Sequence, residues 1–180
     1  HGVAQMYMAG KKHGVRVHYG MEAYCIGSLK TWQEAKEKAE SAKKGKKKTA
    51  VEAVDADQIL DEDEGDAELD AEELGVDKKA LKKKGHLVIL AKSQKGLSDL
   101  FRLSYLAHRD GFYSKPRTDK DMLAAHAGEI VATTACMGGI VSNKCWELKR
   151  GEIEWADVVR EAQEYEEVLG KGNFFLEMQF

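Results

Sequence analysis

The chain has 180 residues, of which 43% are hydrophobic and 33% are charged. That is enough for one domain with a buried core. The 28 Lys and Arg against 31 Asp and Glu give a formal net charge of −3, which excludes a uniformly basic nucleic-acid-binding protein but allows a local basic patch. No apolar run approaches the roughly 20 residues that cross a bilayer, which argues against a membrane partner. Three cysteines without C-x-x-C spacing argue against a disulfide scaffold and favour a reducing, cytoplasmic location.

Residues 1–27 predict a helix, a turn and a strand. Apolar residues recur at helical spacing before a basic last turn, and Gly14 then provides a helix C-cap. Alternating residues over 15–20 predict a short strand, so that Glu22 lies just past its end. Because the chain begins on His1 inside this first element and ends in a strand-like run, we expect a fragment that is cut at both ends.

Residues 28–85 differ in kind from the rest of the chain. Before residue 55 this segment has eight Lys and four Glu, residues 55–77 carry twelve acids and no base, and 78–85 carry five Lys. Blocks of like charge usually stay solvated, so we expect an exposed, mobile insertion with a frayed helix over 31–44. The alternative is that Lys43–Lys48 form a basic arm that contacts DNA.

Order resumes at Gly85, after which turn and capping residues divide the chain into short elements. The predicted elements are strand 86–91, helix 96–109, helix 118–126, strand 129–135, helix 140–149, helix 153–169 and strand 173–180. Strands that alternate with helices predict an α/β fold with a mainly parallel sheet and helical crossovers. The predicted organisation is therefore one domain made of 1–27 and 86–180, interrupted by the charged insertion 28–85.

Three polar residues stand next to predicted strands in otherwise apolar surroundings: Glu22, His86 and Cys136. Carboxylate, imidazole and thiolate are all metal-ligand groups, and a carboxylate can bridge two ions. The spacing alone leaves a second interpretation open, since a single buried Cys or His is commonly a structural core residue. No spacing typical of a zinc finger, a phosphate loop or a nucleophile elbow occurs.

Several longer motifs follow one another in order, and only 28–85 lies outside them. They are G-V-R-V-H-Y-G-M-E-A-Y at 14–24, H-L-V-I-L-A-K at 86–92, G-L-S-D-L at 96–100, G-F-Y-S-K-P-R-T-D at 111–119, I-V-A-T-T-A-C-M-G-G at 130–139, and F-F-L-E-M-Q at 174–179. Together they resemble the PHP (polymerase and histidinol phosphatase) domain of bacterial C-family replicative DNA polymerases, the family of the DNA polymerase III alpha subunit.

The resemblance implies a distorted (β/α) barrel, of which this chain would form a part, with up to three divalent ions at its C-terminal mouth. Carried over residue by residue, it implies Glu22 as the bridging carboxylate, with His86 and Cys136 as further ligands of Zn, Mn or Fe. The family's H-x-H, T-D-H and D-x-H ligand motifs do not occur in this sequence. The chain by itself is therefore expected to bind metal weakly and to be inactive.

For the intact protein, the resemblance implies a DNA-directed DNA polymerase of DNA replication, a nucleotidyltransferase whose Mg-dependent polymerase site lies outside this chain. The implied partners are the DNA primer–template, deoxynucleoside triphosphates and replisome subunits such as the sliding clamp and a proofreading exonuclease. The PHP domain itself would carry a potential 3′–5′ exonuclease. Two alternatives remain: a stand-alone phosphoesterase of the histidinol phosphatase type, or an inactive PHP scaffold that binds a separate exonuclease.

Lys115 and Arg117 lie in a polar loop with the only proline of the chain. A planar guanidinium matches the geometry of a phosphate, so both residues are candidate contacts to the DNA backbone. The alternative is that the Lys-Pro-Arg segment simply fixes the conformation of this loop.

Overall fold

The computed structural model describes residues 2–46, 81 and 83–179. The chain divides into two compact units, His1–Leu29 with Lys84–Phe180 and, separately, Lys30–Lys83. The predicted boundaries of the charged insertion, at residues 28 and 85, remain a prediction. Among the described residues, none of the helices has the length and apolarity that a bilayer span requires.

The N-terminal part confirms the predicted helix but not the strand after it. Helix α1 spans Val3–His13 and ends on Gly14, whose left-handed φ of 67° is typical of a C-cap. Residues 15–19 have no regular structure, because Val17 packs against Gly10 of α1 instead of a neighbouring strand. Strand β1 begins later and spans Gly20–Cys25. The prediction that Glu22 follows a strand is therefore wrong, and Glu22 lies within β1.

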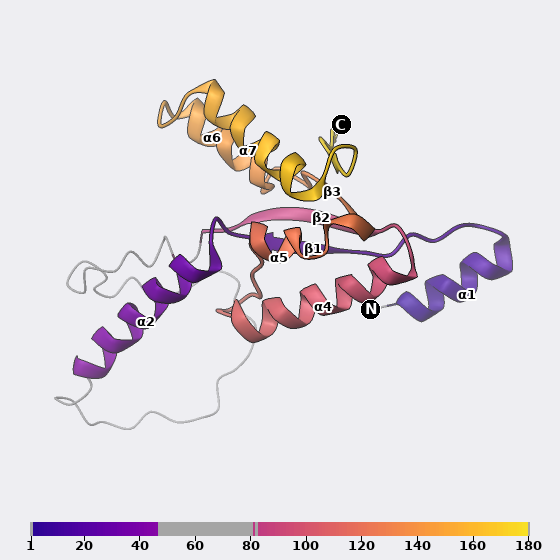
Figure 1. Cartoon of the computed structure of the whole chain (residues 1–180), viewed down its shortest axis with the longest axis horizontal. Helices are drawn as coiled ribbons and strands as arrows, with labels where there is room; N and C mark the ends of the chain where they lie inside the picture. The colour runs from indigo at the N-terminus through magenta and orange to yellow at the C-terminus, as the bar shows by residue number, and fades with distance from the viewer. Residues whose placement is uncertain (1, 47–80, 82, 180) are drawn as a thin grey trace. The chain divides into compact units, whose positions relative to one another are not determined.

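A four-stranded sheet of order β1-β2-β3-β4 forms the centre of the larger unit (Figure 1). Strands β2, β3 and β4 span Gly85–Ala91, Ile130–Thr133 and Phe174–Phe175. The pairs β1–β2 and β2–β3 are antiparallel, and only β3–β4 is parallel. The prediction of mainly parallel strands is therefore wrong; the sheet is mixed and open.

The chain path explains the antiparallel pairs. Between β2 and β3 the chain follows the sheet twice, once in helix α4 (Gln94–Asp110) and once back through α5 (Lys120–Ala124) and the 3-10 helix η3 (Ala127–Glu129). Thr118, between these passes, bridges to Cys25 at one end of the sheet, and the Glu129 carbonyl accepts a hydrogen bond from the Lys92 N–H at the other. Two passes return the chain to the end that it left, so β3 runs opposite to β2.

The insertion produces the other antiparallel pair. In the β1–β2 ladder Cys25 faces Gly85, so the chain leaves and re-enters the sheet at the same end. Helix α2 (Leu29–Lys46) confirms the helix predicted over 31–44, and within the smaller unit the indole N–H of Trp32 donates to the Leu81 carbonyl at 3.0 Å. The side chains of the proposed DNA-binding arm, Lys43–Lys48, lie outside the described residues.

The helices in the last part of the chain lie close to their predicted positions. Helix α6 spans Ile140–Lys149 and α7 spans Trp155–Leu169, where Glu154 and Asp157 form a capping box. Strand β4 is only two residues long, because the chain of β3 leaves the ladder just after Thr134, whose N–H donates to the Phe175 carbonyl. The predicted strand over 173–180 is therefore wrong for residues 176–179, and residue 180 lies outside the described residues.

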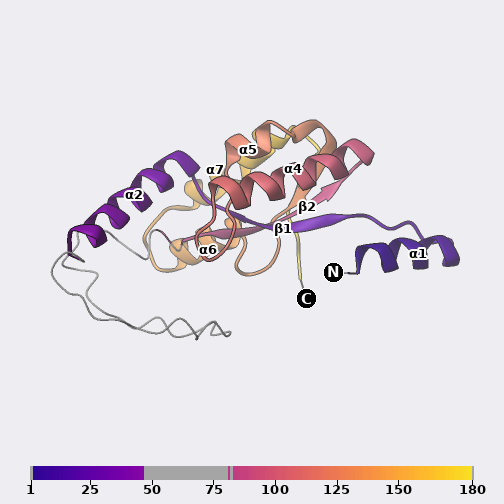
Figure 2. The same ribbon diagram turned by 90° about the horizontal axis from the view of Figure 1, so that it is seen from below.

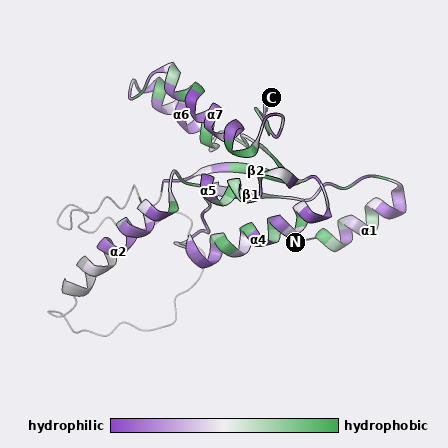
Figure 3. Ribbon diagram, in the orientation of Figure 1, coloured by the Kyte–Doolittle hydropathy of each residue, from purple (hydrophilic) through white to green (hydrophobic). Residues whose placement is uncertain are grey.

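The two faces of the sheet have different surroundings. One face carries buried residues that form the core with side chains from α4, α5 and α7: Ala23, Cys25, Leu87, Ile89, Ile130 and Ala132 from the strands, with Leu100, Leu103, Leu123, Tyr165 and Leu169 from the helices. Helix α4 packs along β1 and β2 (Figure 2), and α7 packs along β3 and β4. Helix α4 carries hydrophobic and hydrophilic residues side by side, as expected for an amphipathic helix on a core (Figure 3). The opposite face, which carries Glu22 and His86, is half exposed.

Candidate metal centre

The three predicted ligands come together at the half-exposed face of the sheet. His86 faces Tyr24 across the β1–β2 ladder, and Glu22 lies two residues before Tyr24. Side chains two residues apart share one face of a strand, so Glu22 and His86 are diagonal neighbours. Cys136 enters from the turn that follows β3.

The ligand atoms are close enough to surround one ion. His86 Nδ1 lies 2.8 Å from Glu22 Oε1 and 3.3 Å from Cys136 Sγ, and the three ligand atoms all lie within 4.8 Å of one another. Donor atoms on one tetrahedral ion are about 3.3–3.8 Å apart when each bond is about 2.0–2.3 Å long. One carboxylate, one imidazole and one thiolate in this arrangement therefore suit a divalent metal such as zinc, provided that His86 Nδ1 and Glu22 Oε1 move slightly apart.

The turn after β3 is built to direct Cys136 toward His86. Ala135 has a left-handed φ of 57°, which is unusual for a residue other than glycine. The Cys136 carbonyl accepts hydrogen bonds from the Gly139 N–H and the Ser142 hydroxyl. A Cβ on Gly139 would lie 1.9 Å from the Thr134 carbonyl oxygen, so only glycine permits this turn.

A second glycine leaves room beside the ligand atoms. The carbonyl of Gly138 accepts the N–H of His86, which ties the turn to the start of β2. A Cβ on Gly138 would lie 3.5 Å from the His86 ring and 3.8 Å from Cys136 Sγ. The missing side chain therefore keeps space open next to two of the three candidate ligands.

Sequence reasoning missed two neighbours of the site. The ring of Tyr24 meets the His86 ring edge-on, with centroids 5.1 Å apart, and the Lys84 ammonium lies 5.2 Å from the Tyr24 ring centroid. Lys84 precedes His86 by two residues, and alternate residues of a strand share one face. This spacing is the signal that could have identified Lys84 from the sequence. Tyr24 depends on the register of β1 against β2, which no local pattern reveals.

The two candidate DNA contacts have different environments. Arg117 is completely buried, and its Nη1 donates to the carbonyls of Tyr113 and Lys115 at 2.6 and 2.8 Å. Burial also lowers the pKa of the Arg117 guanidinium. These contacts favour the interpretation that Arg117 fixes its own loop. Lys115 is half buried, and its role as a phosphate contact stays a prediction.

Comparisons with known proteins assign the chain to a family. A family model described as the PHP domain matches residues 1–180. Curated proteins named DNA polymerase III subunit alpha are similar over about half of the chain. The one from Saccharopolyspora erythraea is 37% identical over 93 residues (52% of this chain, 7% of that protein), and the one from Aquifex aeolicus is 35% identical over 96 residues (52% and 8%). One from Helicobacter pylori strain J99 is 35% identical over 105 residues (56% and 9%).

This chain thus matches less than a tenth of the length of each of these relatives. The family model, in contrast, covers the whole chain and includes all three candidate ligands. The chain belongs to the PHP domain family and is homologous to the corresponding part of the DNA polymerase III alpha subunit.

Proposed function

We propose that this chain is the PHP domain of a replicative DNA polymerase and that Glu22, His86 and Cys136 contribute to a metal-dependent 3′–5′ exonuclease centre. One observation carries the proposal: ligands separated by more than 60 and by 50 positions in the sequence meet within 4.8 Å. A purely structural role would not require a carboxylate, an imidazole and a thiol to converge on one half-exposed face.

The three side chains have separate tasks in this proposal. Bound Zn, Mn or Fe would lower the pKa of a bound water and neutralise the oxygens of a phosphodiester. The Glu22 carboxylate is half exposed, so its two oxygens are available to hold neighbouring ions. His86 would bind as a neutral imidazole through a ring nitrogen without a proton, and Cys136 would bind as a thiolate. The present contact of His86 Nδ1 with both partners holds the imidazole in the orientation that a ligand needs.

The polymerase assignment extends from the names of the relatives. In this proposal the complete protein is a DNA-directed DNA polymerase with a Mg-dependent polymerase site outside residues 1–180. It would act in the cytoplasm on a primer–template and deoxynucleoside triphosphates, beside a sliding clamp and a separate proofreading exonuclease.

Two other functions compete with this one. The stand-alone phosphoesterase is the weaker alternative, because the relatives that match are named as polymerase subunits. The inactive scaffold is disfavoured by the clustered ligands. The coding sequence on both sides of this segment separates the three. A polymerase palm with H-x-H, T-D-H and D-x-H motifs supports the proposal, a stop soon after one D-x-H indicates the phosphoesterase, and a palm with degraded motifs indicates the scaffold.

The decisive experiment changes Cys136→Ala in the complete polypeptide that carries this sequence. We expect loss of bound metal and of 3′–5′ exonuclease activity on a single-stranded 3′ end, with primer extension retained. Cys145→Ala is the matched control, because Cys145 is exposed on α6 and is not among the three clustered side chains. Exonuclease activity that survives Cys136→Ala unchanged would disprove the proposal.

A further inference from the structure

A second site lies just before the strand that carries Glu22. Residues 1–21 contain no Asp or Glu, whereas Lys11, Lys12 and Arg16 are all exposed. This positive stretch stands out in a chain whose net charge is −3. A local basic surface with no acid to compete for it attracts polyanions.

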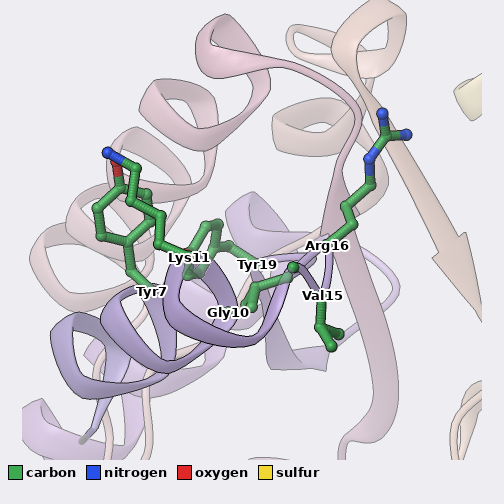
Figure 4. A pocket seen from close by; sticks show the side chains of 8 residues that line it. Tyr7, Gly10, Lys11, Val15, Arg16 and Tyr19 are labelled. Atoms are coloured by element: carbon green, nitrogen blue, oxygen red, sulfur yellow. The ribbon is translucent and has the colours of Figure 1, made fainter.

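The basic stretch borders a cavity of about 320 Å³ between α1 and the irregular segment that follows it (Figure 4). Its lining comprises Tyr7, Gly10, Lys11, Gly14, Val15, Arg16, Val17 and Tyr19. The volume is at the lower end of the range for small-ligand sites. The lining includes two cationic side chains, two phenol rings and no carboxylate, so it suits an anion that also has a flat aromatic part.

The two tyrosines supply the aromatic surfaces of the cavity. The Lys11 ammonium lies 5.2 Å from the Tyr7 ring centroid, which holds the cation beside an aromatic face. Among the described residues, the Tyr19 hydroxyl is buried and has no hydrogen-bond partner. That hydroxyl is enclosed by the protein, so Tyr19 offers its ring to the cavity and not a hydrogen-bond donor.

We propose that this cavity binds one nucleotide unit of a single-stranded nucleic acid. The base stacks on a tyrosine ring of the lining, and the Lys11 ammonium contacts the phosphate of that unit. In Figure 4 the Arg16 guanidinium points away from Tyr7 and Lys11, so it contacts the next phosphate along the strand. Aromatic stacking combined with cations along the backbone is the usual way of binding single strands without sequence preference.

The position of the cavity connects it to the metal centre. The Tyr19 carbonyl accepts a hydrogen bond from the Ala91 N–H at the end of β2, and β1 begins at the next residue, Gly20. A strand held at the cavity therefore lies beside the sheet that carries Glu22 and His86. The identification of the ligand as a nucleic acid rests on the proposed function, whereas the binding itself needs no metal.

The test measures binding of fluorescein-labelled short oligo(dT) to the full 180-residue chain in EDTA, by fluorescence anisotropy at several salt concentrations. The double variant Lys11→Gln, Arg16→Gln should bind at least about tenfold more weakly, and the slope of log K against log salt should fall by about 1.4, which is 0.7 for each lost contact. Lys171→Gln is the control, because Lys171 is exposed in the turn before β4 and should change the affinity by less than twofold.

Two further experiments test whether the bases of the oligonucleotide take part in binding. Tyr7→Leu removes an exposed aromatic ring from the lining and should weaken binding several-fold without unfolding the chain, as followed by circular dichroism. An oligomer of the same length without bases should bind at least about tenfold more weakly, because it cannot stack. Competition by dTMP indicates a site that also takes free nucleotides, and no competition indicates one that needs a strand.

Equal affinity of the double variant and the Lys171→Gln control, or equal binding of the oligomer without bases, would overturn the proposal. Because EDTA removes divalent ions, failure of the exonuclease proposal does not change this result. Failure of nucleotide binding likewise leaves the metal centre untouched.

Discussion

Two cysteines near the same end of the sheet have opposite environments. Cys25 ends β1 on the core face, is 2% exposed and lies 3.2 Å from the Thr118 hydroxyl. Burial raises the pKa of its thiol to about 11. Cys136 lies on the other side, half buried and 3.3 Å from His86 Nδ1. The comparison shows that the face of a sheet decides whether a thiol is an inert core group or a candidate ligand.

The comparison can be tested most strongly at the turn that directs Cys136. Gly139→Ala places a Cβ 1.9 Å from the Thr134 carbonyl oxygen, and backbone must move to relieve this contact. We expect a loss of about 3 kcal/mol or more in the free energy of unfolding, measured by urea denaturation. Gly128→Ala is the control, because its Cβ would meet nothing within 4 Å. Equal stability of the two variants would show that the turn does not depend on glycine.

Metal binding separates the two thiols directly. Cys136→Ala should weaken the affinity of the full chain for Zn²⁺ at least about 100-fold, since removing a group that merely orients a ligand already costs 10- to 100-fold. Cys25→Ala should leave the affinity within a few-fold, because the Cys25 side chain lies on the core face. Calorimetric titration measures both. Similar losses in the two variants would contradict the assignment of Cys136 as a ligand.

The raised pKa of Cys25 predicts a pH dependence of stability. The folded state keeps the thiol proton up to about pH 11, whereas the unfolded chain loses it near 9.0. The unfolded state therefore binds fewer protons between these values, and the free energy of unfolding should fall by about 2 kcal/mol as the pH rises from 9 to 11. Urea denaturation across this range checks it. The fall should be smaller by that amount in Cys25→Ala, and an identical fall would exclude Cys25 as its source.

The smallest expected change in stability is at Thr118, whose hydroxyl contacts the buried thiol of Cys25. Thr118→Val keeps the shape of the side chain but removes the hydroxyl that contacts Cys25 Sγ. The same hydroxyl donates to the Tyr24 carbonyl at 3.4 Å. Because both contacts are long, we expect their loss together to lower the free energy of unfolding by about 1 kcal/mol. Zn²⁺ affinity serves as the second measurement and should remain unchanged. A variant that loses metal as well would show that the two faces of the sheet are coupled.

The sequence by itself determined the local features of this protein. Gly14 predicted the end of α1, and the boundaries of α6 were correct to the residue, because caps and helical periodicity act over a few residues. The residue types at 22, 86 and 136 marked three side chains that the structure brings together, although only the family resemblance favoured ligands over core residues, and ordered motifs predicted the family.

Only the tertiary structure decided the direction of the strands and the environment of each side chain. The two passes through α4 and α5 make β3 antiparallel to β2, and the register places Tyr24 opposite His86. Arg117, expected as a possible phosphate contact, is completely buried in its own loop. These outcomes depend on contacts between residues far apart in the chain, whose free energies local sequence patterns do not encode. The cavity beside α1 likewise exists only because the segment that follows the helix packs back on Gly10.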